Sequence, residues 1–537
     1  MPDDRTASRK PASRPAAQPE GTPDPAADPI RHVIVLMLEN RSFDQILGAM
    51  QEVYPDLDGV KGGGPPRSNR DADGQPVEQA PVAGARMKDD PKHELPNALH
   101  QLEDDNGNFV LDFAKAYPHS AKDERRQIMA YFPLDKLPAL HALAREFTVC
   151  DRWFSSLPGS TWPNRLFVHS GTSLGQALMP QGLFDLAKQH YDQDTVYDRL
   201  NERKVDWRIY FGDFPQSMLL EHQRRPENAR RYRPMKQFFA DAEGPEFKFP
   251  AYSFIEPRYY APHQNDDHPP HDVYGAQRLI ADVYNAVRKN ERLWESTLLV
   301  ILYDEHGGFY DHVSPPAAVP PDEHRQEYSF DRLGVRVPAV LVSPWVDKRV
   351  EHTVFDHTSV LKYAIEKWSL GPLGERAASA TSLAVALRPG GEPRRDTPER
   401  LVVPEPAPAT LAEEAKEATE LNELQMAMVA LAMFLEVQTP GDPKQVVDRL
   451  KSMMESPAEQ ARFAADAVRR FVGAAEKSTA KPAGGKAPPK RVVTKGHGGK
   501  GGQGSAHRKK VSVKKVRHEE AEVRAGRPKG KTRVRPA

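Results

Sequence analysis

The sequence predicts an α/β fold in which helices flank a mostly parallel central β-sheet. Two apolar runs, His32–Leu38 and Thr297–Tyr303, are rich in aliphatic and β-branched residues. Uninterrupted apolar runs of this length are typical of strands that are buried on both faces. Residues 273–294 have apolar side chains at helical spacing and lead directly into the second run. This alternation of helix and strand is typical of a parallel sheet with helical connections.

The other elements follow in chain order. Residues 59–85 are rich in Gly, Pro and Asp, which predicts an excursion at the surface. Residues 335–342 predict a further strand, and residues 357–369 predict a helix. Residues 388–411 are rich in Pro and charged residues and predict a linker. Residues 412–475 have apolar residues at i, i+3 and i+4, which predicts a segment of two or more helices.

These elements predict an ordered body, residues 29–387, between two extensions that we expect to be disordered. Residues 1–28 are rich in Pro, Ala, Asp and Arg, and residues 476–537 are of low complexity. Residues 481–537 hold 18 Lys and Arg against 3 Glu, whereas the whole chain has a net charge of zero. A basic tail of this kind can bind nucleic acid or an anionic membrane surface. The alternative is a flexible, solubilising extension.

Several classes of protein are excluded or disfavoured by composition. The chain of 537 residues has one cysteine, Cys150, which excludes an internal disulfide and any zinc or iron–sulfur site built from cysteines. The first 28 residues contain no apolar core of a signal peptide, and no run of about 18 apolar residues predicts a transmembrane helix. We therefore expect a cytoplasmic protein, and export by a route that needs no signal peptide stays open.

Each of the two predicted strands ends at acidic residues. Glu39 and Asn40 follow the first strand, and Asp304 and Glu305 follow the second. Ligands of open α/β sheets bind outside the carboxyl ends of the strands, so we expect these side chains to converge. Oxygen ligands of this type favour hard cations such as Ca²⁺, Mg²⁺ or Mn²⁺. The sequence therefore predicts metal-assisted chemistry at this edge.

A hydroxyl residue in residues 151–165 is a candidate nucleophile. Ser160 and Thr161 follow Pro158 and Gly159 and precede a segment that we expect to be helical. The start of a helix favours an anion, and a nearby cation could activate the hydroxyl for attack on phosphorus. The same residues are also typical of an ordinary helix cap. The pattern alone does not choose between these explanations or between the two hydroxyls.

Histidines lie beside aspartates in three places, at His93, His268 and His312. Histidine titrates near neutral pH and can protonate a leaving oxygen or hold a phosphoryl oxygen. The alternative is that each is an ordinary hydrogen-bonded residue of a polar loop.

Four motifs resemble those of the bacterial phosphoesterase family and occur in the same order. They are residues 39–44 (ENRSFD), 160–165 (STWPNR), 265–270 (NDDHPP) and 304–313 (DEHGGFYDHV). The resemblance covers about residues 30–368. The family contains phosphatidylcholine-type phospholipases C and a group of acid phosphatases. The resemblance implies that residues 29–387 form a phosphoesterase catalytic domain with a core like that of the alkaline phosphatase and arylsulfatase superfamily.

The resemblance also implies roles for individual residues. The implied cation ligands are Glu39, Asn40, Thr161, Asp304 and Glu305. The implied catalytic residues are Thr161 as the nucleophile together with His93, His268 and His312. We expect Asn164 and Arg165 of the second motif to contact the substrate. Zinc occurs in the superfamily, so the divalent cation is Ca²⁺, Mg²⁺, Mn²⁺ or Zn²⁺.

The resemblance implies metal-assisted hydrolysis of phosphoric esters through a phosphothreonine intermediate, with a phospholipid substrate as in a phospholipase C. One alternative is a phosphomonoesterase of the acid phosphatase type. An alternative of another class is a scaffold protein that binds polyanions through its basic tail. The chain differs from the larger phospholipases C in two respects, because it shows no export signal and has helices and a tail in place of their C-terminal domains. The alcohol part of the substrate and the oligomeric state stay open.

Overall fold

A computed structural model describes most of the chain between residues 28 and 480. The described ranges are 28–61, 65–81, 86–180, 182–260, 263–388, 390–404 and 420–480. The expected disordered segments, residues 1–28 and 476–537, therefore lie almost entirely outside the described residues. Among the described residues, no helix is both long enough and apolar enough to cross a membrane.

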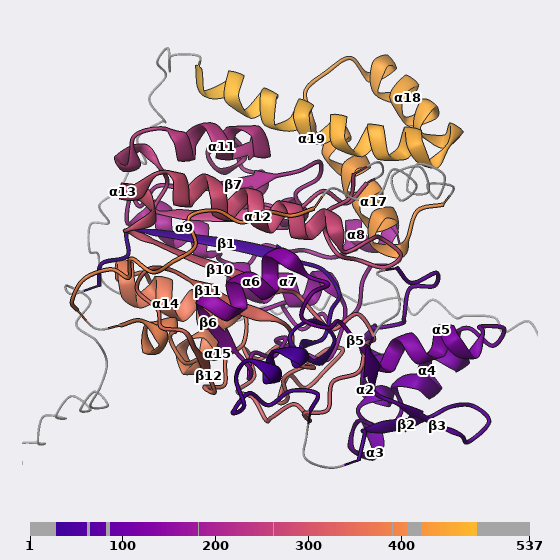
Figure 1. Ribbon diagram of the computed structural model, residues 1–537. Helices are drawn as coiled ribbons and strands as arrows, with labels where there is room; N and C mark the ends of the chain where they lie inside the picture. The colour runs from indigo at the N-terminus through magenta and orange to yellow at the C-terminus, as the bar shows by residue number, and fades with distance from the viewer. Residues whose placement is uncertain are drawn as a thin grey trace, which may run out of the picture. The chain divides into compact units, whose positions relative to one another are not determined.

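The centre of the structure is an eight-stranded sheet with the strand order β12-β6-β11-β10-β1-β9-β7-β8 (Figure 1). Neighbouring strands are parallel except at β11, which is antiparallel to β10 and β6. The predicted mostly parallel α/β sheet is thus confirmed. The strands are β1 His32–Leu38, β6 Thr148–Cys150, β7 Trp207–Phe211, β8 Tyr232–Pro234, β9 Tyr252–Glu256, β10 Thr297–Tyr303, β11 Ala339–Val342 and β12 Arg349–Glu351.

Both faces of the sheet are covered, because every residue of β1 and β10 is buried and successive residues of a strand point to opposite faces. The α-helices of the body are α1 Phe43–Ile46, α2 Leu95–Gln101, α3 Glu103–Asn106, α4 Phe109–Ala116, α5 Lys122–Arg126, α6 Pro138–Glu146, α7 Thr161–Ser170, α8 Leu183–Lys188, α9 Val196–Glu202, α10 Pro226–Ala229, α11 Met235–Glu243, α12 Tyr274–Lys289, α13 Glu291–Trp294, α14 Thr358–Trp368 and α15 Gly374–Ser379. Alternate side chains of β9, Tyr252 and Phe254, contact aromatic side chains of α7, α9 and α14. A second group of helices consists of α12 with α6 and α11 beside it.

Short elements complete the body. The 3₁₀ helices are η2 Gly48–Glu52, η3 Gln127–Met129, η4 Gln216–Leu219, η5 Glu221–Arg224, η6 Glu246–Lys248 and η7 Leu383–Ala386. The surface excursion predicted at residues 59–85 contains an antiparallel pair, β2 Ser68–Arg70 with β3 Pro76–Glu78, and β4 Ala80–Pro81, which pairs with β5 Ala130–Tyr131. This segment therefore has more regular structure than its Gly and Pro content indicates.

Two predicted elements differ in extent. The helix predicted at residues 273–294 is interrupted at Asn290, whose side chain caps α13 by accepting a hydrogen bond from Leu293 N. The strand predicted at residues 335–342 begins only at Ala339, because Pro338 has no N–H to donate to a ladder. The residues before Pro338 bond instead to the segment that follows β6, with Val337 N donating to Trp153 O.

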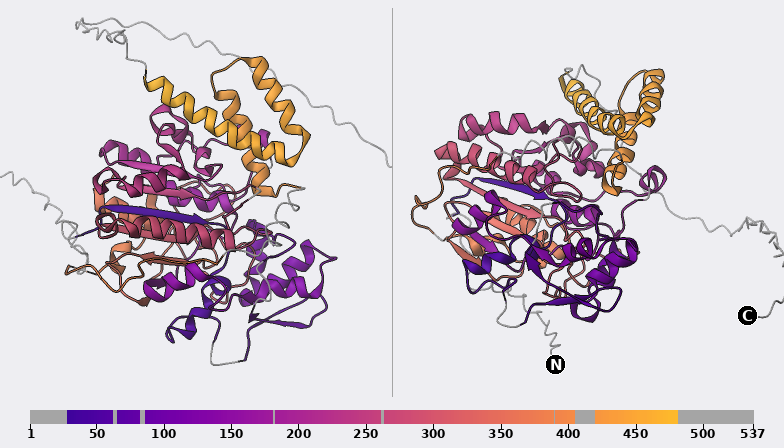
Figure 2. Two further views of the ribbon diagram at one scale, coloured as in Figure 1. Left: turned by 45° about the horizontal axis from the view of Figure 1, so that its top comes forward. Right: turned by 45° about the vertical axis from the view of Figure 1, so that its right-hand side comes forward.

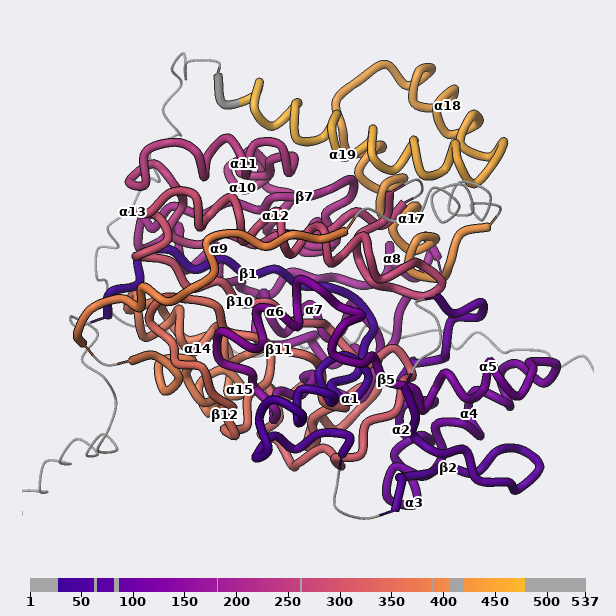
Figure 3. Tube along the Cα trace, in the orientation of Figure 1, coloured from indigo at the N-terminus to yellow at the C-terminus, as the bar shows by residue number. Residues whose placement is uncertain are grey.

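The C-terminal helices lie at one edge of the sheet. They are α17 Glu423–Gln438, α18 Pro443–Ser452, the 3₁₀ helix η8 Met453–Glu455 and α19 Pro457–Ala480. Figure 2 shows these orange and yellow helices from two further sides, and Arg233 of β8 pairs with Glu476 of α19. The Cα trace in Figure 3 shows α17 between α19 and α8, and it contacts both.

The boundaries of this segment differ from the prediction. Helix α19 continues to Ala480, five residues past the expected end at residue 475. The described part of the predicted linker, residues 390–404, lies against α12, where Tyr284 Oη donates to Pro398 O and Leu401 N donates to Asn285 Oδ1.

Candidate active site

The adjacent strands β1 and β10 bring the two acidic motifs together. The strands pair from His32↔Thr297 to Leu38↔Tyr303, so the residues that follow them emerge side by side. Asn40 N donates to Asp304 Oδ1 at 3.1 Å, and the residue before it, Glu39, is fully buried. Glu305 is also fully buried. The structure thus assembles the four predicted ligands of the strand ends at one place.

Two glycines after β10 allow this close approach. Gly307 has a φ of +62°, and a Cβ there would lie 2.2 Å from Asn40 O. Gly308 has a φ of +73°, and a Cβ there would lie 2.8 Å from Lys92 O. Positive φ angles and contacts this short admit only glycine. The loop after β10 therefore passes directly against Asn40 and the segment that carries His93.

Thr161 is the first residue of α7 and lies beside the acidic cluster. Its Oγ1 is 3.4 Å from Glu39 Oε2, and its side chain is buried. Ser160 occupies the N-cap position but makes no side-chain capping bond, and its Oγ is buried without a hydrogen-bond partner among the described residues. An ordinary helix cap therefore does not explain this pair of hydroxyls. The hydroxyl that contacts the acidic cluster is that of Thr161.

Asn164 and Arg165, which we expected to contact substrate, are engaged elsewhere. The amide of Asn164 bonds to the backbone of the preceding turn, donating to Gly159 O at 2.9 Å and accepting from Leu157 N at 3.1 Å. Arg165 binds Glu39 Oε1 through Nη2 at 2.6 Å and Asp304 Oδ2 through Nε at 3.1 Å. A buried guanidinium has to pair its charge, and here it does so with the acidic cluster.

A further carboxylate belongs to the cluster, and sequence reasoning missed it. Glu256 is the last residue of β9, the other neighbour of β1, and is fully buried. Its Oε2 is 3.9 Å from Arg165 Nη1 and accepts a hydrogen bond from Gln216 N at 2.7 Å. Gln216 also donates through Nε2 to Glu39 Oε1 at 2.7 Å. An apolar stretch that ends in an acid was the available signal, but β9 is short and contains a serine.

The electrostatics of the cluster are dominated by burial. Burial raises the pKa of Glu39 well above its usual range, Arg165 opposes this, and the neighbouring Asp304 adds to it. Burial also raises the pKa of Glu256. Three buried carboxylates, those of Glu39, Asp304 and Glu256, surround the Arg165 guanidinium, so acidic groups outnumber it. Two further oxygens, Asn40 Oδ1 and Glu305 Oε1, are buried with no hydrogen-bond partner in the described part of the chain.

Two histidines stand on the Asn40 side of the cluster. His93 Nε2 lies 3.0 Å from Asn40 Nδ2 and 3.8 Å from Glu305 Oε1. Burial opposes its charged form, but the carboxylates of Glu305 and Asp90 outweigh burial and raise the pKa of His93 to about 9. The ring of His268 packs edge-on against that of His93, with a centroid distance of 6.0 Å. The structure thus brings both predicted histidines to the cluster.

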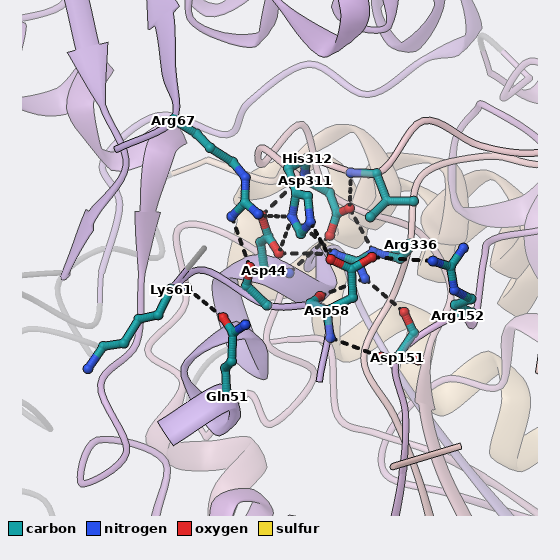
Figure 4. Close-up of polar contacts among 12 residues, drawn as sticks. Asp44, Gln51, Asp58, Lys61, Arg67, Asp151, Arg152, Asp311, His312 and Arg336 are labelled. Carbon is teal, nitrogen blue, oxygen red and sulfur yellow. Dashed lines mark hydrogen bonds and ion pairs between the residues drawn. The ribbon is translucent and has the colours of Figure 1, made fainter. Parts of the chain in front are cut away.

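His312 belongs to a different network (Figure 4). Its Nδ1 is 2.9 Å from Asp44 Oδ2, and its Nε2 is 2.9 Å from Asp58 Oδ1. Arg336 joins this network through Asp44 and Asp311, at 3.0 and 2.8 Å. Asp44, Asp311 and His312 have ligand atoms close enough to hold a metal ion, but Arg336 already pairs with both carboxylates. In this structure His312 therefore forms ion pairs with Asp44 and Asp58.

Comparison with known proteins agrees with the resemblance carried by the motifs. Residues 30–371 match the phosphoesterase family. Non-specific phospholipase C1 of Arabidopsis thaliana is 34% identical over 83% of this chain and 86% of that protein. Non-specific phospholipase C6 of the same plant is 35% identical over 76% of this chain and 81% of that protein. Hemolytic phospholipase C of Pseudomonas aeruginosa is 29% identical over 62% of this chain and 52% of that protein.

Among solved structures, a protein in the alkaline phosphatase superfamily from Vibrio parahaemolyticus is similar at 12% identity and a TM-score of 0.26, over 45% of this chain and 62% of that chain. The family match covers well over half of the sequence, including both strands that carry the acidic motifs and the helix that begins at Thr161. The chain therefore belongs to the phosphoesterase family and is a hydrolase of phosphoric esters.

Proposed function

We propose that the chain hydrolyses phosphodiesters as a phospholipase C does, with Thr161 as the nucleophile. The observation that carries this proposal is the position of the Thr161 hydroxyl, 3.4 Å from Glu39 at the joined ends of β1 and β10. Relatives that share about a third of their residues with this chain over most of its length are named phospholipases C. A phospholipid is therefore the substrate class that we assign.

We assign the cation site to five residues that offer only oxygen ligands. They are Glu39, Asn40, Thr161, Asp304 and Glu305. The excess of buried carboxylates and the two buried oxygens that accept no hydrogen bond from the described residues fit a divalent cation, and Ca²⁺, Mg²⁺, Mn²⁺ and Zn²⁺ all remain candidates. A cation bound there would polarise a phosphoryl oxygen and lower the pKa of the Thr161 hydroxyl.

Each step of the reaction is then assigned to a residue of the chain. Thr161 Oγ1, ionised by loss of its proton to water, attacks phosphorus as the bond to the alcohol breaks, which forms a phosphothreonine. We assign His93, whose Nε2 lies 3.8 Å from Glu305 Oε1, as the group that protonates the departing alkoxide. In the second half, water attacks the same phosphorus, His93 takes back a proton, and the bond to Thr161 breaks. His268 packs against His93 and completes the phosphate-facing side.

Arg165 and Glu256 both bind other residues of this site. Arg165 ties Glu39 to Asp304, and Glu256 holds the backbone of Gln216, whose side chain bonds to Glu39. We therefore propose that both are positioning residues that fix the orientation of the Glu39 carboxylate.

The test is a set of three variants assayed on two substrates. Thr161→Ala should lose hydrolysis of phosphatidylcholine by about 10⁴-fold or more, as expected for removal of a nucleophile. Thr161→Ser should keep a substantial part of the activity, because the attacking oxygen survives, and Ser160→Ala should have a mild effect. Mass spectrometry of acid-quenched enzyme should find phosphate on Thr161. Phosphate on Ser160 or full activity of Thr161→Ala would overturn the assignment.

The second substrate, a small aryl phosphate monoester, separates the two hydrolase types. Faster turnover of phosphatidylcholine supports the phospholipase C. Faster turnover of the monoester would show that the chain is a phosphomonoesterase with the same nucleophile.

A further inference from the structure

Helix α17 is apolar around its whole circumference, yet one side of it is uncovered. Only Glu423 and Glu436 of its residues are charged. Met426 is 54% exposed and Val437 is 69% exposed, with the half-buried Met433 between them. Met433 lies about two helical turns after Met426, and Val437 about three turns after it, so the three residues form one stripe along the helix. A helix that is apolar on all sides normally lies in a protein core or in lipid.

The neighbouring helix α8 adds to this apolar surface. Phe184 is 84% exposed, whereas Leu186, two residues later, is buried against the body. Helices α8 and α17 contact each other (Figure 1). A hollow of about 170 Å³ lies between them, and Leu186, Leu431 and Phe434 contribute to its wall. Exposed apolar side chains that gather on one region of a protein usually mark a binding surface.

Helix α17 is joined to the active site. At the amino-terminal end of α17, Glu423 Oε1 pairs with Lys92 Nζ at 2.5 Å, next to His93. Asn422, the N-cap of α17, has its Nδ2 3.4 Å from His268 Nδ1. The amino-terminal end of α17 therefore lies next to His93 and His268, the proposed phosphate-facing histidines.

We propose that Phe184, Met426, Met433 and Val437 form an interfacial docking surface that inserts into the polar–apolar boundary of a phospholipid membrane. This proposal rests on the proposed function, since it names where that substrate is met. A phospholipid is held in its layer by its acyl chains, so its phosphate reaches Thr161 only if the enzyme sits on the layer. Exposed apolar side chains beside the site provide this contact, as in helices that lie in the membrane interface.

The test uses the full chain and measures binding and hydrolysis separately. Phe184→Glu and Val437→Glu place a charge at exposed positions, where it should leave the fold intact, and Met426→Gln is a milder variant. Each glutamate variant should weaken binding to phosphatidylcholine vesicles by about tenfold or more, because burial of one large apolar side chain has an effect of that order. Hydrolysis of the vesicles should fall in parallel. Hydrolysis of a water-soluble, short-chain phosphocholine ester should change by less than about twofold.

Phe247→Glu is the matched control. Phe247 is 77% exposed but lies in η6, where its neighbour Glu246 bonds to His32 at the start of β1, the end opposite Glu39. This variant should bind vesicles as the wild type does. Unchanged vesicle binding in both glutamate variants, or an equal loss in Phe247→Glu, would overturn the proposal.

Two further outcomes distinguish this proposal from a failure of the proposed function and from a dimer interface. If the wild type hydrolyses neither substrate, the proposed function fails, and the vesicle-binding comparison still decides the docking surface. If light scattering finds a dimer of the wild type that becomes monomeric in Val437→Glu, a second copy of the chain covers the stripe, and membrane docking is refuted.

Discussion

Replacing Arg165 with methionine tests the account of the acidic cluster most directly. The substitution keeps an unbranched side chain of similar length and removes the guanidinium that contacts Glu39 and Asp304, at 2.6 and 3.1 Å. All three side chains are buried, so the two carboxylates would lose their partner without gaining water. Breaking a buried ion pair from one side costs about 3–5 kcal/mol. We expect the free energy of unfolding to fall by that amount at neutral pH.

The assay is urea denaturation with and without a divalent cation. A lower midpoint with an unchanged slope identifies a loss of stability in the folded state. The deficit should shrink as the pH is lowered, because Glu39 already has a raised pKa and takes up a proton more readily without Arg165. Added cation should stabilise the variant more than the wild type, since the variant has a larger excess of negative charge.

Arg395→Met is the matched control for this measurement. Arg395 also pairs with two carboxylates, those of Glu291 and Glu295, but its side chain is 64% exposed. Exposed ion pairs contribute about 0–1 kcal/mol, so this variant should differ little from the wild type. If Arg165→Met is as stable as Arg395→Met at neutral pH, the buried cluster does not carry the charge that we assign to it.

Three further predictions concern other parts of the chain. Glu39→Ala and Asp304→Ala should each abolish turnover and reduce the metal content without changing the circular dichroism spectrum; wild-type turnover and metal content in both would place the site elsewhere. In His312→Gln, the free energy of unfolding should fall most below about pH 6.5. The difference from wild type should vanish as the pH rises through about 9, because the carboxylates beside His312 outweigh burial and raise its pKa to about 9. A difference independent of pH would contradict this. The chain should bind polyanions through residues 481–537, with a net charge of +15, and lose this binding steeply with salt; binding that survives deletion of these residues would contradict the prediction.

The sequence predicted those parts of the site that depend on local pattern. The strands β1 and β10 are uninterrupted apolar runs, and the acids that follow them are adjacent because parallel strands end at one edge. The roles of Thr161 and the histidines were assigned from the resemblance of the motifs to a family, because a hydroxyl residue in a turn is also typical of a helix cap.

The parts that the sequence did not predict depend on contacts between distant segments. The ion pairs of Arg165 with Glu39 and Asp304 were not predicted, because the burial of a guanidinium among carboxylates is not visible in its own motif. Glu256 was missed because β9 has only five residues, and the contacts of His312 with Asp58 and Arg336 were not predicted because both residues belong to other parts of the sequence. The contact between α17 and His268 spans 154 residues of sequence.

The continuous pairing of β1 with β10 has a consequence for how this protein tolerates insertions. Each pair from His32↔Thr297 to Leu38↔Tyr303 is held by the backbone, so the positions of Glu39 and Asp304 are set by strand length. One extra residue within β1 would move Glu39 by about 3.3 Å along the strand and turn its side chain to the opposite face. The same addition in the excursion between β1 and α2 would leave both strands unchanged. Length variation among relatives should therefore collect in that excursion and be absent from β1 and β10.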